Sequence, residues 1–392
     1  MRTSYVTSDM LGLEHALSLF FAAISNFVVC CCFYNRFTLP DARLYKHMTT
    51  PLTTLRSTIR FSQTLYHTAA ATTSMASVAT IDLTVKGEFV RKPTAFHNKI
   101  TADGSSGFKA EANRYHLYVC YACPFASRTL AVRKLKGLEK IISLNVVDWF
   151  LDEGGWKFNP NRDDVTTADT VNGSERLREV YLKADSCYAG AITVPVLWDK
   201  KTGTIVNNES AEIIRIFNCE FNEFCATPEQ AALDLYPQPL QAEIDEFNSW
   251  IYPTINNGVY RCGFAKSQEP YNVAVHQVFE SLDRVEEILS RKRYLCGNQL
   301  TEADIRLFVT LVRFDQVYHG HFKCNKKCLR EYPNLWGYTR DIYQHRGIGE
   351  TVNIEHIRNC YMASQLNINP FGIIPIGPDL DFEAPHGREN MK

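Results

Sequence analysis

The chain has 392 residues, enough for two domains that each bury a hydrophobic core. Hydrophobic residues make up 45% and charged residues 22%, an ordinary balance for a globular protein, and the formal net charge of −1 gives no electrostatic basis for binding nucleic acid. The thirteen cysteines lack the regular spacing of a disulfide framework, which indicates free thiols in a reducing compartment. Because Cys324 and Cys328 have no second Cys/His pair, no metal site is expected there.

The first part of the chain differs in composition from the rest. Residues 16–33 form an apolar run that is typical of a signal-peptide core or a short membrane anchor. Residues 43–80 carry basic, Ser and Thr residues and no acidic residue, as an organelle transit peptide does. We therefore expect a leader over residues 1–84 that contacts a membrane or an import machinery and directs the protein to a mitochondrion or plastid. The alternative is a disordered tail on a cytoplasmic protein.

The next part of the chain alternates between strand and helix patterns. A hairpin signal at Lys200-Lys201-Thr202-Gly203 joins its last two strands. This order predicts an α/β thioredoxin-like domain over residues 85–235, with helices on both faces of a small sheet. The expected strands are 114–120, 141–147, 193–198 and 204–206, and the expected helices are 124–136, 174–184 and 209–218.

Cys123 stands where the first strand hands over to a helix that Pro124 opens. Unpaired N–H groups and the positive end of the helix dipole favour a thiolate, so we expect the pKa of Cys123 to lie below its ordinary value. The position three residues into the helix is Ala126, so the site lacks the resolving thiol of a dithiol motif. We interpret Cys123 as a monothiol nucleophile and Cys120, within the strand, as a packed residue.

Pro195 interrupts an apolar strand, where it removes a hydrogen-bond donor. In a thioredoxin-like layout this residue is a cis proline that faces the nucleophile and exposes the backbone of Val194 to a peptide ligand. The alternative is an edge-strand proline without a chemical role.

Helical periodicity replaces this pattern after the Pro-rich linker at 235–239. Leu240, Ile244, Phe247 and Ile251 share one face, and a second apolar face runs from Val275 to Leu289. Thr301-Glu302-Ala303-Asp304 resembles a capping box that opens a third helix running on to Val317. We predict an all-α domain over residues 236–378 and a tail over 379–392.

Several segments resemble the glutathionyl-hydroquinone reductases, the xi class of glutathione transferases. The resemblance spans roughly residues 85–378 and implies the soluble glutathione transferase fold and a homodimer. The segments that carry it are 123–130 (CPFASRTL), 155–158 (GWKF), 181–185 (YLKAD), 194–210 (VPVLWDKKTGTIVNNES), 257–260 (NGVY), 263–265 (GFA), 313–325 (RFDQVYHGHFKCN), 332–338 (YPNLWGY) and 369–373 (NPFGI).

The resemblance also implies the chemistry. Cys123 attacks the sulfur of an aromatic glutathione thioether, releases the hydroquinone and is left as a mixed disulfide, which a second glutathione resolves to glutathione disulfide. The remaining roles follow by motif: Val194, Glu209 and Ser210 bind glutathione, Trp156 stacks on it, and Tyr260 and Tyr361 polarise the quinol oxygen, with Tyr318 a further candidate from the same pocket.

The motif departs from the family pattern at two positions. Phe125 replaces a Trp, and Ser127 replaces a bulkier polar residue, which affects substrate preference more than thiol chemistry. Two alternatives remain open: an omega-like thiol transferase or dehydroascorbate reductase that uses the same Cys123, and a non-catalytic interaction module of the same fold. A transferase that activates glutathione with Ser or Tyr is disfavoured, because Cys123 occupies that place.

Overall fold

The computed structural model describes residues 84–85 and 87–391. The predictions for the leader, including the apolar run 16–33 and the basic stretch 43–80, lie outside these residues. Within the described ranges no helix is long and apolar enough to cross a membrane.

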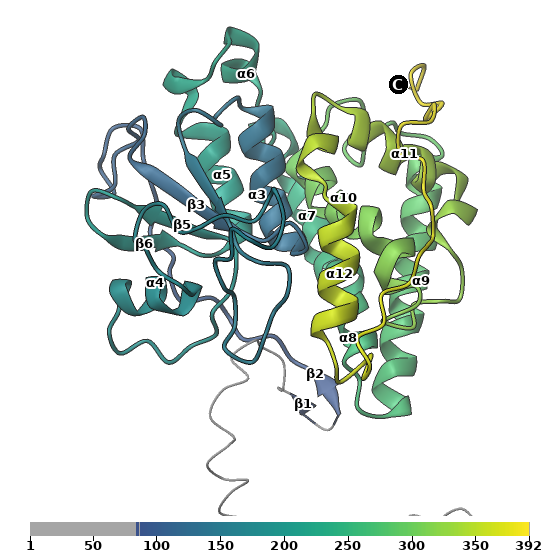
Figure 1. Ribbon diagram of the computed structural model, residues 1–392. Helices are drawn as coiled ribbons and strands as arrows, with labels where there is room; N and C mark the ends of the chain where they lie inside the picture. The colour runs from purple at the N-terminus through teal and green to yellow at the C-terminus, as the bar shows by residue number, and fades with distance from the viewer. Residues whose placement is uncertain (1–83, 86, 392) are drawn as a thin grey trace, which may run out of the picture. The chain divides into compact units, whose positions relative to one another are not determined.

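A four-stranded sheet forms the first half of the described chain (Figure 1). Its strand order is β4-β3-β5-β6; β3 pairs with β4 in parallel and with β5 antiparallel, and β5 and β6 form the predicted hairpin. The whole of β3 and β5 is buried, as expected for central strands covered on both faces. The strands are β3 (Tyr115–Val119), β4 (Ser143–Val146), β5 (Val196–Asp199) and β6 (Thr204–Asn207).

Helices cover both faces of this sheet. The helices α3 (Pro124–Leu135) and α5 (Ser210–Cys219) pack against each other on one face, and α4 (Leu177–Ala184) lies beside β6 on the other (Figure 1). The predicted thioredoxin-like layout is therefore confirmed, and each element begins within three residues of its expected start.

The segment that precedes the sheet links the two halves of the described chain. Its hairpin, β1 (Thr84–Val85) and β2 (Glu88–Phe89), lies beside the helical half, where Arg261 donates to Glu88 at 2.9 Å. Further along, the N–H of Asn98 donates to the carbonyl of Val206 at the edge of the sheet. Residues 87–98 thus run from the helical half to the sheet.

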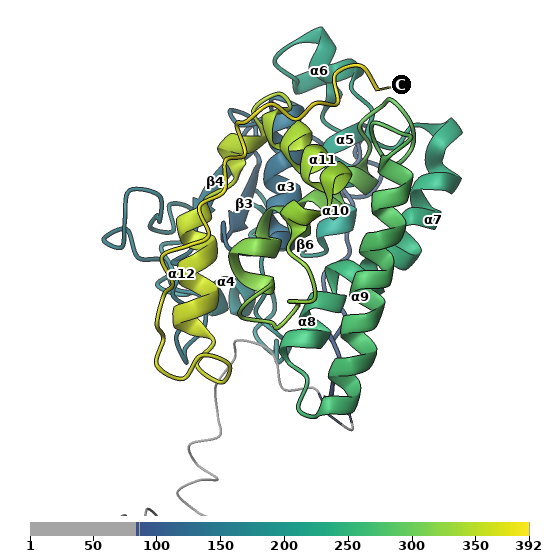
Figure 2. The ribbon, with the colours of Figure 1, turned by 90° about the vertical axis from the view of Figure 1, so that its right-hand side faces the viewer.

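The second half is helical, as predicted (Figure 2). Its α-helices are α7 (Gln241–Ile251), α8 (Gly258–Gly263), α9 (Gln268–Leu289), α10 (Glu302–Arg313), α11 (Pro333–Gln344) and α12 (Ile354–Ser364). The short α6 (Pro228–Ala232) precedes them and lies on the sheet half, where Lys136 donates to the carbonyls of Ala231 and Leu233 (Figure 1). Shorter turns are 3₁₀ at Asn222–Phe224, Gln238–Leu240, Leu329–Glu331 and Ile348–Thr351, and π-helical at Tyr252–Asn256 and Phe314–Tyr318.

The predicted apolar faces form the core of this half. Ile244, Phe247 and Ile251 are buried on α7, and the face from Val278 to Leu289 is buried on α9. The third predicted helix differs in one respect: α10 ends at Arg313, and the chain continues to Tyr318 as a π-helical turn. The predicted tail packs against the helices, since the buried Arg388 donates to the carbonyls of residues 289, 292 and 293.

Candidate active site

Cys123 caps the N-terminus of α3. Its N–H donates to the carbonyl of Cys120 at 3.1 Å, so the chain turns sharply between the end of β3 and the helix. Pro124 is the first helical residue, where its missing N–H costs no hydrogen bond. The side chain is half-buried, and its Sγ donates to the carbonyl of Val194 at 3.5 Å.

The peptide bond between Val194 and Pro195 is cis, as predicted. Val194 is buried, and its carbonyl accepts from the Cys123 thiol two residues before β5 begins. The predicted approach of nucleophile and proline segment is therefore present, although Cys123 and Val194 stand 71 residues apart in the sequence.

The prediction of a depressed pKa for Cys123 is wrong for this state of the protein. Burial raises the pKa of the thiol, and this effect outweighs the N–H groups of Ala126 and Phe125 and the charge of Arg313, which lower it. The sequence identified the helix N-terminus correctly, but not the surrounding side chains that exclude water from the sulfur.

Arg313 is a residue of this site that sequence reasoning missed. It is 1% exposed, donates to the carbonyls of Tyr121 and Ala122, and reaches the Ser127 hydroxyl at 2.6 Å. The helical domain thereby holds the backbone of the cysteine turn and places a positive charge near the sulfur. The only sequence signal was its position at the start of the family-like segment 313–325.

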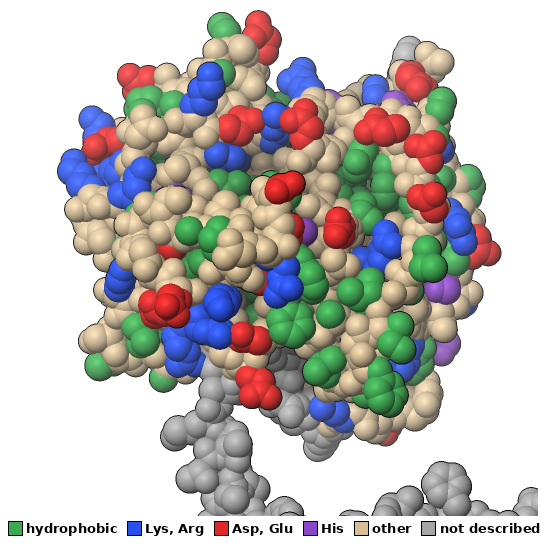
Figure 3. Space-filling view, in the orientation of Figure 1, with side chains coloured by type: hydrophobic (Ala, Val, Ile, Leu, Met, Phe, Trp, Pro, Cys, Tyr) green, Lys and Arg blue, Asp and Glu red, His purple; other side chains and the backbone are tan. Residues whose placement is uncertain are grey.

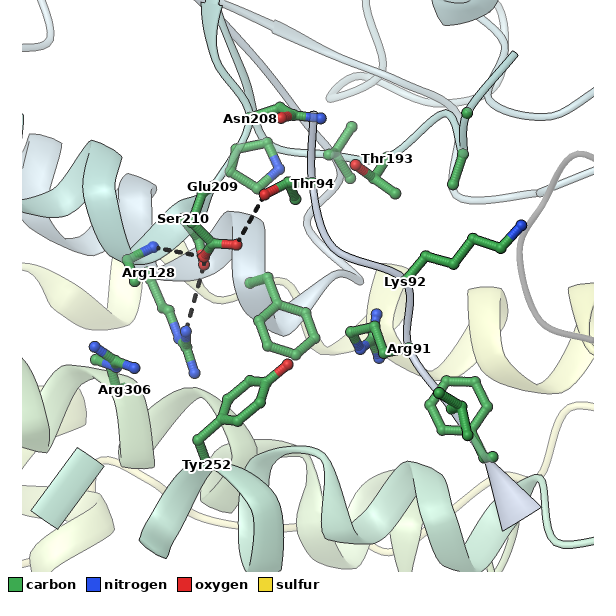
Figure 4. A pocket seen from close by; sticks show the side chains of 18 of the residues that line it. Arg91, Lys92, Thr94, Arg128, Thr193, Asn208, Glu209, Ser210, Tyr252 and Arg306 are labelled. Atoms are coloured by element: carbon green, nitrogen blue, oxygen red, sulfur yellow. Dashed lines mark hydrogen bonds between the residues drawn. The ribbon is translucent and has the colours of Figure 1, made fainter. Parts of the chain in front are cut away.

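A cavity of about 610 Å³ lies beside Pro195 and Phe125 (Figure 4). Of the predicted site residues, Val194, Glu209 and Ser210 line it. Trp156 does not line it in the described structure; this side chain is half-buried, and its carbonyl accepts from the N–H of Leu177. The lining is rich in cations: Arg91, Lys92, Arg128, Arg178 and Arg306.

Glu209 and Ser210 stand together at the N-terminus of α5. The Glu209 carboxylate accepts from the N–H of Ala211 at 3.0 Å and from the Thr94 hydroxyl at 3.3 Å, and Arg128 donates to the Ser210 hydroxyl at 3.3 Å (Figure 4). One end of the cavity thus offers a carboxylate for an ammonium group, next to a hydroxyl and a helix N-terminus for a carboxylate.

Two arginines of this wall are incompletely hydrogen-bonded. The Nε atoms of Arg128 and Arg306 are buried without a hydrogen-bond partner among the described residues. Burial, together with the charge of Arg306, lowers the pKa of Arg128 to about 9, which still leaves it charged at neutral pH. Neighbouring buried cations of this kind fit an anionic ligand.

Tyr260, Tyr318 and Tyr361 meet in a hydroxyl cluster near Cys123. The Tyr361 hydroxyl is 2.5 Å from that of Tyr260 and 3.0 Å from that of Tyr318. Burial raises the pKa of all three, and a charge on Cys123 would raise those of Tyr260 and Tyr318 further, which places both hydroxyls within electrostatic reach of the sulfur. Three O–H groups with two contacts between them leave one hydrogen free to donate elsewhere.

Aromatic rings and cations connect this cluster with the cavity. The Phe125 ring lies 6.3 Å from that of Tyr260, and the guanidinium groups of Arg91 and Arg128 lie 4.8 and 4.9 Å from the Phe125 centroid. Phe125 therefore keeps an aromatic contact next to the nucleophile. Among residues 84–85 and 87–391, no group of three or more His, Cys, Asp or Glu side chains is arranged to hold a metal ion.

Family models match both halves of the chain. The glutathione S-transferase N-terminal domain matches residues 122–219, and the glutathione S-transferase C-terminal domain matches residues 261–341.

Curated relatives match over most of their length. Glutathionyl-hydroquinone reductase YqjG of Escherichia coli is 57% identical over 309 residues, 77% of this chain and 93% of that protein. Glutathionyl-hydroquinone reductase PcpF of Sphingobium chlorophenolicum is 47% identical over 292 residues, 74% of this chain and 90% of that protein.

Solved structures agree with these relatives. The glutathione-bound structure of YqjG superposes with a TM-score of 0.73 at 57% identity and covers 76% of this chain and 96% of that one. The xi glutathione transferase of Phanerochaete chrysosporium gives a TM-score of 0.73 at 52% identity, with 75% and 93% covered. The chain belongs to the glutathione transferase family, in the branch that contains the glutathionyl-hydroquinone reductases and the xi-class transferases.

Proposed function

We propose that the protein is an enzyme that reduces glutathionyl-hydroquinones to hydroquinones at the expense of glutathione, and so takes part in the detoxification of quinones. The observation that carries this proposal is the monothiol site: Cys123 lies 3.5 Å from the Val194 carbonyl, beside a cavity with charges for a small zwitterionic peptide. Two curated relatives named as such reductases support it.

The reaction needs two thiol exchanges. The Cys123 thiolate attacks the thioether sulfur, the bond between sulfur and the aromatic carbon breaks, and that carbon takes a proton. The resulting Cys123–glutathione disulfide is attacked by a second glutathione, which leaves as glutathione disulfide and restores the thiol.

The cavity matches glutathione in charge. Glu209 would take the γ-glutamyl ammonium, Ser210 and the α5 N-terminus the adjacent carboxylate, and the backbone of Val194 the cysteinyl part. The basic wall suits the second carboxylate. Trp156 keeps its assigned stacking role in this proposal only if glutathione extends beyond the cavity.

The tyrosine cluster would assist departure of the hydroquinone. The free O–H hydrogen of the cluster would donate to the quinol oxygen while Cys123 attacks the sulfur. Tyr260 is the most exposed of the three, which makes it the first candidate for that donor. Its hydroxyl is hydrogen-bonded to the hydroxyl of Tyr361.

We also propose a protein partner for this chain, a second copy of itself, in addition to glutathione and its aromatic thioethers. Large apolar side chains are exposed between residues 366 and 376, Phe371 at 87% and Ile376 at 96%. Hydrophobic side chains also gather over the helical half in Figure 3. An exposed apolar surface of this kind supports a homodimer.

The leader is proposed to direct the chain into an organelle, on the strength of its basic stretch 43–80, which contains no acidic residue. Fusing residues 1–84 to a fluorescent protein tests this proposal. Fluorescence in a mitochondrion or plastid is expected, whereas diffuse cytosolic fluorescence would contradict it.

The activity is tested with glutathionyl-menadiol and glutathione, following menadiol and glutathione disulfide together. One disulfide per menadiol is expected, with both products lost in Cys123→Ser. Reduction of a mixed disulfide without menadiol release would instead assign the protein to the omega-like thiol transferases. Inactivity in both assays would leave a non-catalytic module.

A further inference from the structure

Two further cysteines lie near the turn that carries Cys123, and the proposed reaction uses neither. Cys120 ends the segment that contains β3 and is fully buried; Cys360 lies on α12 and is 7% exposed. They come from the two halves of the chain, 240 positions apart by their numbers.

Cys120 is close enough to Cys123 for a disulfide to form between them. The hydrogen bond from the Cys123 N–H to the Cys120 carbonyl, 3.1 Å, closes a four-residue turn. Such a turn brings its first and last Cα atoms within about 7 Å, the outer limit for a disulfide. The Cys120 sulfur also lies within electrostatic reach of the Cys123 sulfur, because its charge acts on that thiol.

Cys360 lies on α12, the helix that packs against the turn after Cys120. The Tyr121 ring lies 5.9 Å from the ring of His356, so α12 packs against the turn that carries the cysteines. His356 and Cys360 are four residues apart and share one helix face. Cys360 also contributes to the raised pKa of the Cys120 thiol, which agrees with the two side chains lying close together.

We propose that Cys120 and Cys360 are an internal dithiol that resolves the Cys123–glutathione mixed disulfide when no second glutathione is available. This proposal rests on the proposed function, because that function creates the mixed disulfide.

The exchange balances without any further reactant. The Cys120 sulfur attacks the Cys123 sulfur, glutathione leaves as a thiol, and a Cys120–Cys123 disulfide remains. The Cys360 sulfur then attacks Cys120, and Cys123 leaves as a thiol. The dithiol loses two electrons and two protons, and the mixed disulfide takes them up as glutathione and free Cys123.

Burial determines when this route operates. It raises the pKa of Cys120 well above its ordinary value, so little thiolate is present at neutral pH. Attack by Cys120 is therefore slow, and free glutathione reaches the mixed disulfide first wherever it is abundant. The internal route becomes the main one only when glutathione is depleted.

The test charges the full-length reduced protein with glutathione disulfide, removes free glutathione by desalting and follows the intact mass. The mass with one glutathionyl group is expected first, followed by the mass of the protein less two hydrogens, with glutathione released. After alkylation of free thiols, peptide mapping should locate the disulfide at Cys120–Cys360 and an alkyl group on Cys123.

Single variants separate the steps. Cys120→Ala should keep the glutathionyl group, and Cys360→Ala should stop at a Cys120–Cys123 disulfide. Cys262→Ala is the matched control, since Cys262 is also buried beside a second buried cysteine, Cys324, and it should behave as the unmodified protein does.

Two results would overturn the proposal. A glutathionyl group that persists in the unmodified protein as long as in Cys120→Ala would refute the internal dithiol and leave the reductase function intact. A protein that takes up no glutathionyl group at Cys123 would refute the nucleophile itself, and the internal dithiol with it.

Discussion

Arg313 contributes to the chemistry of Cys123 without being a neighbour in sequence. Its charge lowers the pKa of the thiol, and its guanidinium holds the carbonyls of Tyr121 and Ala122. Removing the charge in Arg313→Ala should therefore raise the pKa of Cys123 further. We expect the rate of alkylation of Cys123 by iodoacetamide, followed against pH, to rise at a higher pH than in the unmodified protein.

Arg133 provides the matched control for this variant. It is also a buried arginine that donates to backbone carbonyls, those of Glu139 and Ile142, but it is not among the main groups that shift the pKa of Cys123. Each variant leaves buried carbonyl acceptors unpaired, and each such group lowers the free energy of unfolding by about 1–3 kcal/mol. An equal displacement of the alkylation profile in Arg133→Ala would show that loss of packing, not loss of the Arg313 charge, is responsible.

Tyr260→Phe removes the hydroxyl that stands 2.5 Å from that of Tyr361. If this group donates to the quinol oxygen, kcat for glutathionyl-menadiol should fall by about a hundredfold, the usual effect of a lost acid catalyst. Burial raises the pKa of Tyr260, so the hydroxyl stays protonated throughout the neutral range and adds no ionisation there.

A second substrate separates chemistry from folding in Tyr260→Phe. Reduction of a glutathione mixed disulfide needs Cys123 but no proton on a quinol oxygen, so its rate should be unchanged. Equal losses with both substrates would contradict the assigned role of Tyr260.

Sequence reasoning found those site residues that lie in continuous motifs. Cys123 was identified from the strand-to-helix junction, Val194 from the proline that follows it, and Glu209 and Ser210 from the family-like segment; the cavity brings the last three together. Arg313 and Arg91 were missed, because their roles arise from packing between parts of the chain that are far apart. The prediction of a lowered pKa for Cys123 was wrong for the same reason, since burial by distant residues cannot be read from a local pattern.

The N-terminus of α10 depends on one buried carboxylate. Asp304 accepts from the N–H of Leu295, the N–H and hydroxyl of Thr301, and the hydroxyl of Tyr338, all between 2.8 and 2.9 Å. Asp304→Ala leaves these donors unpaired, so the free energy of unfolding should fall by at least about 3 kcal/mol, measured by urea denaturation.

Asp245 is the control for Asp304. It is a half-exposed carboxylate on α7 that pairs with Arg215 at 2.8 Å. An exposed ion pair contributes only about 0–1 kcal/mol, so Asp245→Ala should change stability little. A comparable loss in the two variants would contradict the assignment of the α10 N-terminus to Asp304.

Predictions of whole elements succeeded where the local sequence carries a clear signal. The strands β3 and β5 were found as apolar runs, α3 from the proline that opens it, and α7 and α9 from a sustained helical period. The helices α8, α11 and α12 were not predicted individually. Helix α8 is only six residues long. Helices α11 and α12 are amphipathic, and the surfaces that their apolar faces pack against are determined by the tertiary fold. The change of α10 into a π-helical turn has no marker in the local sequence.

The residues directly after the proposed leader include a segment that the site needs. Arg91, Lys92 and Thr94 line the cavity, and Thr94 donates to Glu209. A chain that starts at residue 84 should therefore keep the full kcat/KM for glutathionyl-menadiol. In that shortened chain, Arg91→Ala combined with Thr94→Ala should raise KM for glutathione about tenfold, the effect of about 1.4 kcal/mol of lost binding. Loss of activity on removal of residues 1–83 alone would contradict this division.

The exposed apolar segment near the C-terminus is the strongest argument for assembly. Covering its side chains with another surface would remove apolar area from water, and each Å² removed contributes about 25 cal/mol of favourable free energy. If a second copy covers it, Phe371→Lys combined with Ile376→Lys should convert a dimer into a monomer, measured by light scattering during size-exclusion chromatography.

Val273 supplies the control, because it is an exposed apolar residue on α9, outside the segment of residues 366–376. Val273→Lys should leave the dimer intact. If residues of one copy are enough to form the site, the monomeric double variant should still release menadiol. Loss of activity together with the dimer would show that the partner completes the site, and a dimer that survives both substitutions would place its interface on another face.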